Sequence, residues 1–238
     1  MTTRFTSRLL SVCAAVLCAT VANAGTLGNQ TYSDSSNDID PGIASGGGTL
    51  DLLSMEVSNT ATDVVFRLTV NGNVSGAGSV DWGKFMIGIS TGGAGDTSSN
   101  GWGRPISMST AAGGMDYWIG SWVDSGGGGQ LWNYNGSSWS GPGGLANFSF
   151  SGNQITYTAS LSSLGLSIGD TFFFDAFSSG GGGGDSAIDA LANPNVSVTG
   201  WTAPYTSNST FAYTVVPAPG AIALIGLAGG LMARRRRR

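Results

Sequence analysis

Apolar and polar positions alternate along this chain in short segments that are separated by glycine-rich stretches. The clearest segment is 64–70, where Val64, Phe66, Leu68 and Val70 share one side of an extended strand and the residues between them share the other. Alternation of this kind is typical of a strand with one buried face. A turn signal, Asn71-Gly72, follows directly. The segment therefore predicts a strand that packs on a core through one face.

Further segments of this kind predict an all-β fold. We expect about nine strands, drawn from eleven candidate segments: 50–57, 64–70, 85–89, 115–123, 130–134, 138–139, 148–150, 154–160, 170–177, 196–198 and 211–215. Segment 170–177 has aromatic residues on both faces, which predicts a central strand that is covered on both sides. Only 161–166 looks like a helical turn. Short strands with this spacing favour a two-sheet antiparallel β-sandwich.

The first 24 residues have the three parts of a secretory signal peptide. Arg4 and Arg8 form the positive region, residues 9–21 form the apolar region, and 22–24 read Ala-Asn-Ala, a small-residue cleavage site. Both cysteines, Cys13 and Cys18, lie inside this segment. We therefore expect an exported chain that has no disulfide and depends on its core alone for stability.

Residues 215–238 predict a sorting tail behind a single body domain, 25–214. Pro217, Pro219 and Gly220 interrupt regular structure, and an apolar run covers 221–233. The chain then ends with Arg234, Arg235, Arg236, Arg237 and Arg238. Arginines stay on the cytoplasmic side of a membrane, so the body is expected outside. The run is shorter than the ~20 apolar residues of a spanning helix, which favours a short membrane helix that acts as a transient stop.

This tail resembles the PEP-CTERM sorting signal of exopolysaccharide-forming Gram-negative bacteria and planctomycetes. The likeness lies in Val216-Pro217, Pro219-Gly220, the apolar run and the arginine cluster. Ala218 stands where the family has glutamate. The resemblance implies a brief stay in the inner membrane and cleavage near the prolines by an exosortase. The protein would then be attached at the cell surface or released.

The body is strongly acidic. The protein has fourteen acidic residues, all of them in the body, where the basic residues are only Arg67, Lys84 and Arg104. A surface of this sign repels nucleic acid and anionic lipid. We therefore expect neither of these as a partner.

Tryptophan supplies the candidate binding residues. Five of the seven tryptophans lie between positions 102 and 139, among glycines. An indole offers a flat apolar face that suits a sugar ring. On one strand, Trp118 and Trp122 would share a face about 13 Å apart. The candidate ligand-binding residues are Trp102, Trp118, Trp122, Trp132, Tyr134 and Trp139.

The same indoles also suit a hydrophobic core. In a chain poor in leucine and isoleucine, tryptophan can serve as core filler, and we expect this for Trp82, Trp118 and Trp201. For Trp102, Trp132 and Trp139 the sequence leaves burial and exposure equally open. A solvent-facing aromatic patch would favour recognition, and seven buried indoles would favour a structural role.

The body also resembles the carbohydrate-binding β-sandwiches of the family-nine and DOMON type. The likeness lies in hydrophobic patterns such as 63–70, 82–89, 116–118 and 161–165, together with the late Asp185 and Asp189. It implies a sandwich fold and a glycan ligand. Related sandwiches also hold haem or bind no known ligand, but the sequence has no histidine to ligate haem, and we interpret its methionines as core or edge residues.

An acidic segment after the signal peptide is a candidate calcium site. Asp34, Asn37, Asp38 and Asp40 offer the oxygen ligands that Ca²⁺ takes, although the EF-hand spacing is missing. Asp185 and Asp189 would add a ligand only if the fold brings them near. The alternative is a flexible, solvated acidic segment.

The residue types favour binding over catalysis. The sequence has no histidine, and the predicted mature chain has no cysteine, so the commonest general base and the thiol nucleophile are missing. A glycosidase needs two carboxylates, for which Asp116 and Asp124 are the best pair. We expect an exported, non-catalytic protein that binds glycan in the polysaccharide matrix. The alternatives are a purely structural or adhesive surface protein and, less favoured, a glycoside hydrolase.

Overall fold

The computed structural model describes residues 28–44, 46–75, 82–195 and 198–217. The predicted signal peptide, the sorting tail beyond Pro217 and most of the predicted strand 196–198 lie outside these residues. None of the helices in the described part of the chain is long and apolar enough to cross a membrane.

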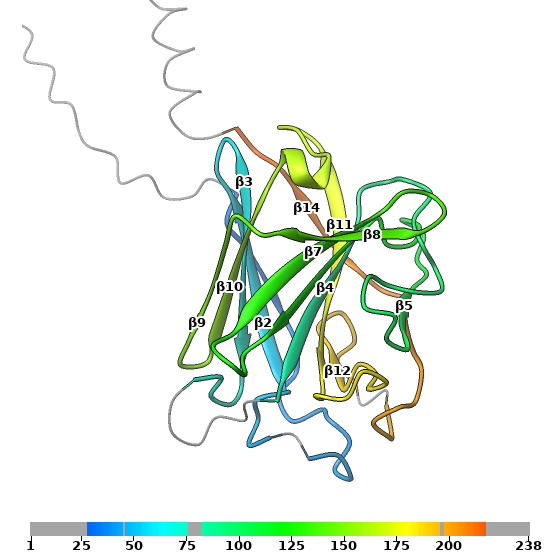
Figure 1. The fold of residues 1–238 in the computed structure, drawn as a ribbon. Helices are drawn as coiled ribbons and strands as arrows, with labels where there is room; N and C mark the ends of the chain where they lie inside the picture. The colour runs from blue at the N-terminus through cyan, green and yellow to red at the C-terminus, as the bar shows by residue number, and fades with distance from the viewer. Residues whose placement is uncertain (1–27, 45, 76–81, 196–197, 218–238) are drawn as a thin grey trace, which may run out of the picture.

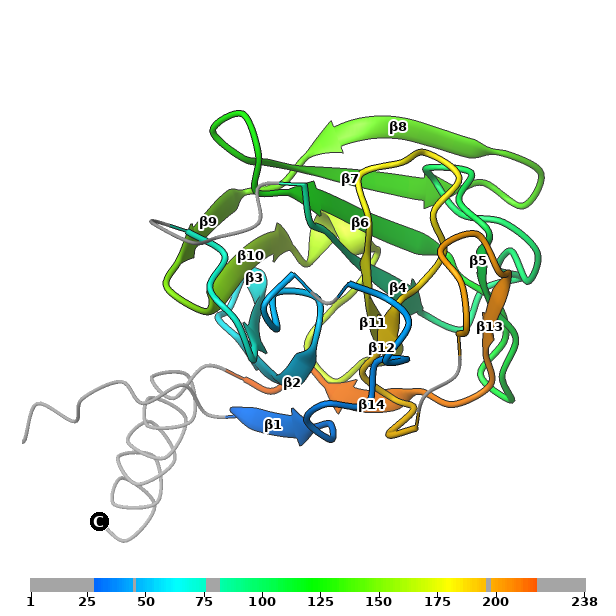
Figure 2. The ribbon, with the colours of Figure 1, turned by 90° about the horizontal axis from the view of Figure 1, so that it is seen from below.

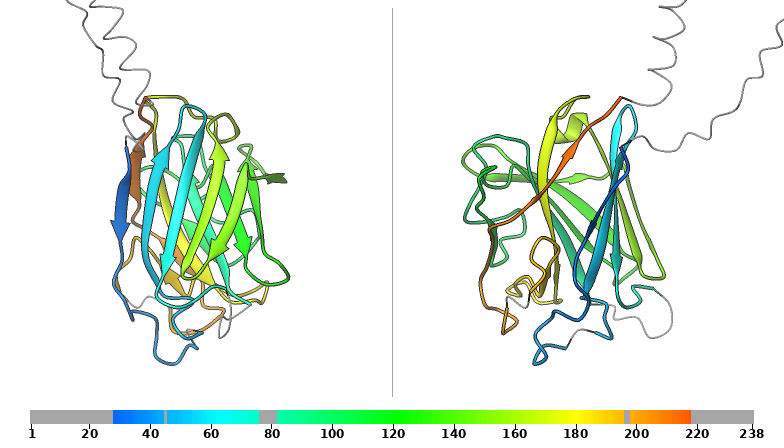
Figure 3. Two further views of the ribbon diagram at one scale, coloured as in Figure 1. Left: turned by 90° about the vertical axis from the view of Figure 1, so that its left-hand side faces the viewer. Right: turned by 180° about the vertical axis from the view of Figure 1, so that it is seen from behind.

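The protein is all-β, and two antiparallel sheets face each other (Figures 1 and 3). The first sheet has the order β1-β2-β3-β10-β9. Its strands are β1 (Gln30–Ser33), β2 (Leu52–Asn59), β3 (Asp63–Val70), β9 (Asn147–Ser151) and β10 (Gln154–Ser160). The second sheet has the order β12-β11-β4-β6-β7-β8, and β14 pairs with β11. Its strands are β4 (Lys84–Ser90), β6 (Tyr117–Trp122), β7 (Gly128–Tyr134), β8 (Trp139–Gly144), β11 (Thr171–Ser179), β12 (Asp189–Ala190) and β14 (Phe211–Thr214).

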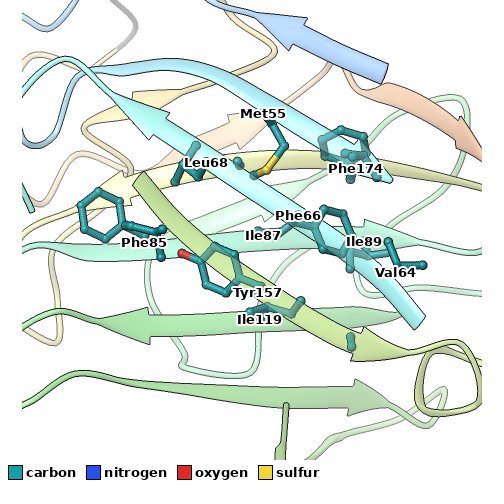
Figure 4. Close-up of a cluster of buried hydrophobic side chains, with 14 of the residues drawn as sticks. Met55, Val64, Phe66, Leu68, Phe85, Ile87, Ile89, Ile119, Tyr157 and Phe174 are labelled. Carbon is teal, nitrogen blue, oxygen red and sulfur yellow. The ribbon is translucent and has the colours of Figure 1, made fainter. Parts of the chain in front are cut away.

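The main core lies between the two sheets. Burial alternates strictly along β3, so the predicted inner face, Val64 to Val70, is the face that packs inward. Phe66 lies edge-on to Phe172 and Phe174 of the opposite sheet, with ring centroids 5.8 and 5.9 Å away. Figure 4 shows side chains of both sheets meeting in this layer. Burying a phenylalanine of this kind stabilises the fold by about 1.5–3 kcal/mol.

A second, smaller core covers the outer face of the second sheet. It contains Met86, Met115, Trp118, Phe177 and Tyr205. The covering segments include a parallel strand pair, β5 (Ile106–Met108) and β13 (Tyr205–Ser207). Figure 2 shows this pair on the side of the second sheet that faces away from the first. Strand β11 is therefore buried on both faces, as its two-sided aromatic pattern predicts.

The structure confirms the all-β prediction and adds strands that the pattern missed. The described residues contain fourteen strands, compared with the nine or so that were predicted. The missed strands are β1, β5, β12 and β13, which have only two to four residues each. Alternation cannot be recognised over so few positions. The predicted helical turn is present as the 3-10 helix η1 (Ser162–Leu164).

The two ends of the described body meet at one pole of the molecule. Gly28 packs against Val216 and Tyr213. The side-chain amide of Asn59 binds the Val216 backbone on both sides, because its oxygen accepts the N–H at 3.0 Å and its nitrogen donates to the carbonyl at 2.8 Å. The loop between β1 and β2 and the short strand β12 lie at the opposite pole (Figures 1 and 3). We call this end the distal pole.

Candidate functional site

The candidate aromatic residues come together on the outer face of β6, β7 and β8. Trp118 of β6 lies directly opposite Trp132 of β7, and Tyr134 of β7 lies opposite Trp139 of β8. Trp102 reaches the same face from the loop between β4 and β5, and its ring centroid is 6.5 Å from that of Trp122. We call the half-buried members the aromatic row, which consists of Trp102, Trp122, Trp132, Tyr134 and Trp139.

Glycines in the sheet allow two of these indoles to lie close to the backbone. The ring of Trp102 packs over Gly120, and the ring of Trp122 packs over Gly128. A Cβ atom at either glycine would overlap the ring above it. Each indole therefore has one face against the sheet.

Hydrogen bonds fix the polar edges of three indoles. The Nε1 atoms of Trp102 and Trp132 both donate to Oε1 of Gln130, at 3.0 and 3.3 Å. Nε1 of Trp139 donates to Oδ2 of Asp96 at 2.9 Å. Burial works to raise the pKa of Asp96, but hydrogen bonds from Ser98 and Trp139 outweigh this effect and lower it. Because the N–H groups bond within the protein, a ligand would meet these three rings mainly through their apolar surfaces.

Trp118 does not belong to the half-buried aromatic row. Its side chain is fully buried and stacks on Phe177, with centroids 6.0 Å apart. Its inclusion among the ligand-binding candidates is therefore wrong, whereas its expected role in a core is confirmed. The covering segments around β5 and β13, which the strand pattern missed, bury it.

Trp82 and Trp201, which we expected in a core, are half-buried. Their rings meet edge to face at 5.7 Å and pack on a small third core at the distal pole. Together with Gly180, Gly181 and Asp185 they line an open cleft of about 290 Å³. The sequence pattern held no signal for this cleft, because its walls come from three separate loops.

The two carboxylates that a glycosidase would need are held apart. Asp116 precedes β6 and Asp124 follows it, so the extended strand separates them by roughly 26 Å. This exceeds the ~5–10 Å between the carboxyl groups of a glycosidase. Asp116 is buried and accepts the backbone N–H groups of Thr91, Gly93 and Gly95. Asp124 pairs with Lys84 at 3.1 Å.

A cluster of carboxylates lies at the distal pole. Oxygens of Asp34, Asp38 and Asp189 all lie within 4.8 Å of one another. Asp34 and Asp38 follow β1, whereas Asp189 belongs to β12 of the other sheet. We call these three residues the acidic cluster. Asp51, which is 2% exposed, lies near enough to raise the pKa of Asp34 and of Asp38 by charge repulsion.

The acidic cluster is poor in hydrogen-bond donors. The buried oxygens Oδ2 of Asp34, both Oδ1 and Oδ2 of Asp38, and Oδ1 of Asp51 accept no hydrogen bond from any other described residue. Burial raises the pKa of Asp34 to about 7, and Asp38, Asp175 and Asp51 add to this rise against a hydrogen bond from Ser35.

Burial also raises the pKa of the other two members. It raises the pKa of Asp38 against the effect of its own backbone N–H. It raises the pKa of Asp189 to about 8, although Oδ2 of Asp189 accepts the Leu52 N–H at 2.6 Å and Oδ1 accepts the Ala190 N–H at 2.8 Å.

Half of the predicted calcium ligands fall in this cluster. Asp34 and Asp38 belong to it, but Asp40 does not, and its Oδ1 accepts the Gly42 N–H at 2.7 Å. Asn37 is exposed and borders the neighbouring pocket of about 470 Å³. Asp189 is the member that the sequence named only conditionally. Asp185 lies outside the cluster and accepts the Gly182 N–H at 2.8 Å.

Comparisons with known proteins add no relative. No protein-family model, no curated protein and no solved structure matches the chain.

Proposed function

We propose that this protein is an exported, non-catalytic surface protein that binds glycan in an extracellular polysaccharide matrix. The observation that carries the proposal is the aromatic row, where five half-buried aromatic side chains from four parts of the chain share one face of the second sheet. A pyranose ring presents C–H groups on its faces, and these pack well on flat, rigid rings. The row therefore supplies the kind of contact that a sugar chain requires.

Rigidity supports this proposal. Trp102 and Trp132 share the Gln130 acceptor, and Trp139 is held by Asp96. Side chains that are already fixed lose little conformational entropy when a ligand binds.

The terminal segments support export and surface sorting. The signal peptide, the apolar run and the arginine cluster are features of the sequence alone. The fold adds that residues 28 and 216, from which these segments lead away, lie against each other at one pole. A protein held there, through an exosortase and transiently through the inner membrane, would present its distal pole outward. The family-nine and DOMON likeness of the body belongs to this proposal as well.

The experiment is retention of the purified protein on polysaccharide affinity gels. Trp122→Ala is the informative variant, because no hydrogen bond of the Trp122 side chain is seen in the described structure and the ring is half-buried. We expect weaker retention without loss of the folded state. Trp201→Ala is the matched control, since Trp201 is also half-buried but lies at the distal pole. Equal retention of the wild type and both variants on every glycan would remove the proposal.

A purely structural or adhesive protein is the second candidate function. The observation in its favour is that Trp102, Trp132 and Trp139 pack against the second core around Trp118. In that case Trp102→Ala lowers the free energy of unfolding by the ~3–5 kcal/mol that is typical of a large aromatic. The wild-type protein is then not retained on any glycan gel. A hydrolase is the least favoured function, because Asp116 and Asp124 stand at opposite ends of β6.

A further inference from the structure

We infer that the acidic cluster at the distal pole binds one calcium ion, held by Asp34, Asp38 and Asp189, with the buried Asp51 nearby. This inference is independent of glycan binding, and it differs from the ligand set that the sequence predicts. It rests on the geometry of the oxygens, on their missing partners and on the absence of a neighbouring positive side chain.

The spacing of the carboxylate oxygens fits a single ion. Ca²⁺ takes oxygen ligands at about 2.3–2.6 Å, so two ligand atoms on opposite sides of the ion are at most ~5 Å apart. The oxygens of Asp34, Asp38 and Asp189 lie within 4.8 Å of one another. One ion can therefore contact all three residues.

The unpartnered oxygens are the second observation. A buried polar atom without a hydrogen bond destabilises the folded state, and more so when it is charged. Three such oxygens belong to the cluster, one on Asp34 and two on Asp38, and a fourth is Oδ1 of the neighbouring Asp51, a residue that is 2% exposed. Loop geometry alone does not explain why a folded protein would keep them together. A cation bound by the cluster would satisfy the unpartnered oxygens of Asp34 and Asp38.

No basic side chain of the described body neutralises the cluster. Arg67 pairs with Glu56, and Lys84 pairs with Asp124. Arg104 donates to Ser179 Oγ and to the Asp185 carbonyl, and it lies 5.5 Å from the centroid of the Trp102 ring. These are the only lysines and arginines between positions 28 and 217. The neutralising charge must therefore come from protons or from a bound metal ion.

The ligand type selects calcium among the common metals. Zinc and copper prefer nitrogen and sulfur ligands, but the sequence has no histidine and its only cysteines lie in the predicted signal peptide. All side-chain ligands here are carboxylate oxygens, which suit hard cations. Mg²⁺ demands a tighter octahedron at 2.0–2.1 Å, whereas Ca²⁺ accepts an irregular set.

The ion would join three parts of the fold. Asp34 and Asp38 belong to the loop after β1, and Asp189 lies in β12, where its Oδ2 also accepts the Leu52 N–H at the start of β2. Calcium would thus connect the two sheets at the pole opposite the chain ends. It would also fix the loop whose residues Ile39 and Ile43 pack in the third core, beside Trp82 and Trp201.

The test compares the melting temperature of the purified protein after EDTA treatment and after addition of CaCl₂ or MgCl₂. At a calcium concentration about a hundredfold above the dissociation constant, we expect Tm to rise by about 5–10 °C. Isothermal titration calorimetry should give one site per chain. A Tm that calcium leaves unchanged would overturn the inference and leave protons as the neutralising charge. An equal rise with MgCl₂ would overturn the assignment of the ion.

Asp38→Asn is the decisive variant, because no other described residue donates to either Asp38 oxygen. It removes charge without breaking a hydrogen bond to a neighbour. In EDTA it should melt at or above the wild-type temperature, and its calcium affinity should fall at least tenfold. Asp34→Asn should behave alike. A metal-independent loss of stability in both variants, with calcium affinity intact, would contradict the inference.

Asp40→Asn is the matched control. Asp40 lies in the same loop and has the same charge, but it is outside the acidic cluster. We expect it to keep the calcium affinity and the Tm rise of the wild type. If it lost them as Asp38→Asn does, the effect would follow from total charge and not from coordination. Unchanged glycan retention in Asp38→Asn would separate this site from the proposed glycan surface.

Discussion

A hydrogen bond through the main core connects the two sheets, and its removal has a defined cost. The hydroxyl of Tyr157, on β10 of the first sheet, lies 2.8 Å from Oγ of Ser121, on β6 of the second. Ser121 uses its hydrogen on the Phe85 carbonyl at 2.9 Å, so Tyr157 is the donor. Both side chains are fully buried, and burial raises the pKa of Tyr157. Tyr157→Phe deletes this donor and leaves the ring in place.

The expected loss follows from that environment. A neutral buried hydrogen bond contributes about 1 kcal/mol, and the lone pair left on Ser121 adds a desolvation cost, so we expect Tyr157→Phe to lose about 1–2 kcal/mol. For a domain of this size the loss lowers Tm by about 2–8 °C. Ser121→Ala should lose a similar amount, because it leaves the buried Tyr157 hydroxyl without a partner.

Urea unfolding of both single variants and the double variant measures the coupling between the two hydroxyls. The double variant should be more stable than the sum of the single losses predicts, by about 1 kcal/mol. Tyr213→Phe with Ser121→Ala is the control pair, since Tyr213 donates to Asn59 at 2.7 Å, away from Ser121. That pair should be additive. Additive losses for Tyr157 and Ser121 as well would refute this packing of the two sheets.

Three further predictions test other parts of the structure. Burial raises the pKa of Asp175 from 3.8 to about 7, so the folded state holds this proton more tightly than the unfolded chain does. The wild type should therefore lose stability relative to Asp175→Asn as the pH rises from about 4 to 7. Urea unfolding in EDTA measures this difference, and a gain in stability would contradict the prediction. In Gly120→Ala the new Cβ overlaps the Trp102 ring, so we expect a loss of about 1–3 kcal/mol together with altered Trp fluorescence; an unchanged spectrum would contradict this contact. Asn59→Ala removes both hydrogen bonds to the Val216 backbone, so limited proteolysis near residue 216 should become faster. An unchanged rate would show that these two bonds do not hold the chain at Val216.

The candidate sites show which of their residues can be predicted from local sequence. Clustering of tryptophan between positions 102 and 139 pointed to the aromatic row, because neighbouring strands of one sheet bring nearby residues together. It did not separate Trp118 from Trp122, which share a face of β6 but differ in burial. Asp34 and Asp38 stood out as an acidic segment, but their partner Asp189 lies far along the chain. Residue type alone predicts a core position for Trp82 and Trp201, and both do pack on the third core, but their shared cleft has no local signal.

The class of fold and the inner faces of the long strands can be predicted from the amino-acid pattern alone. Strict alternation in β3 and aromatic residues on both faces of β11 are enough to identify strands and their buried faces, because side chains on a strand repeat every two residues. The folded structure is needed to learn which strands are neighbours, which outer faces are covered and which distant carboxylates meet. Those outcomes depend on contacts between segments that are remote in sequence, such as β5 with β13 and Asp34 with Asp189. Local periodicity carries no information about such contacts, since many pairings of the same strands bury the same faces.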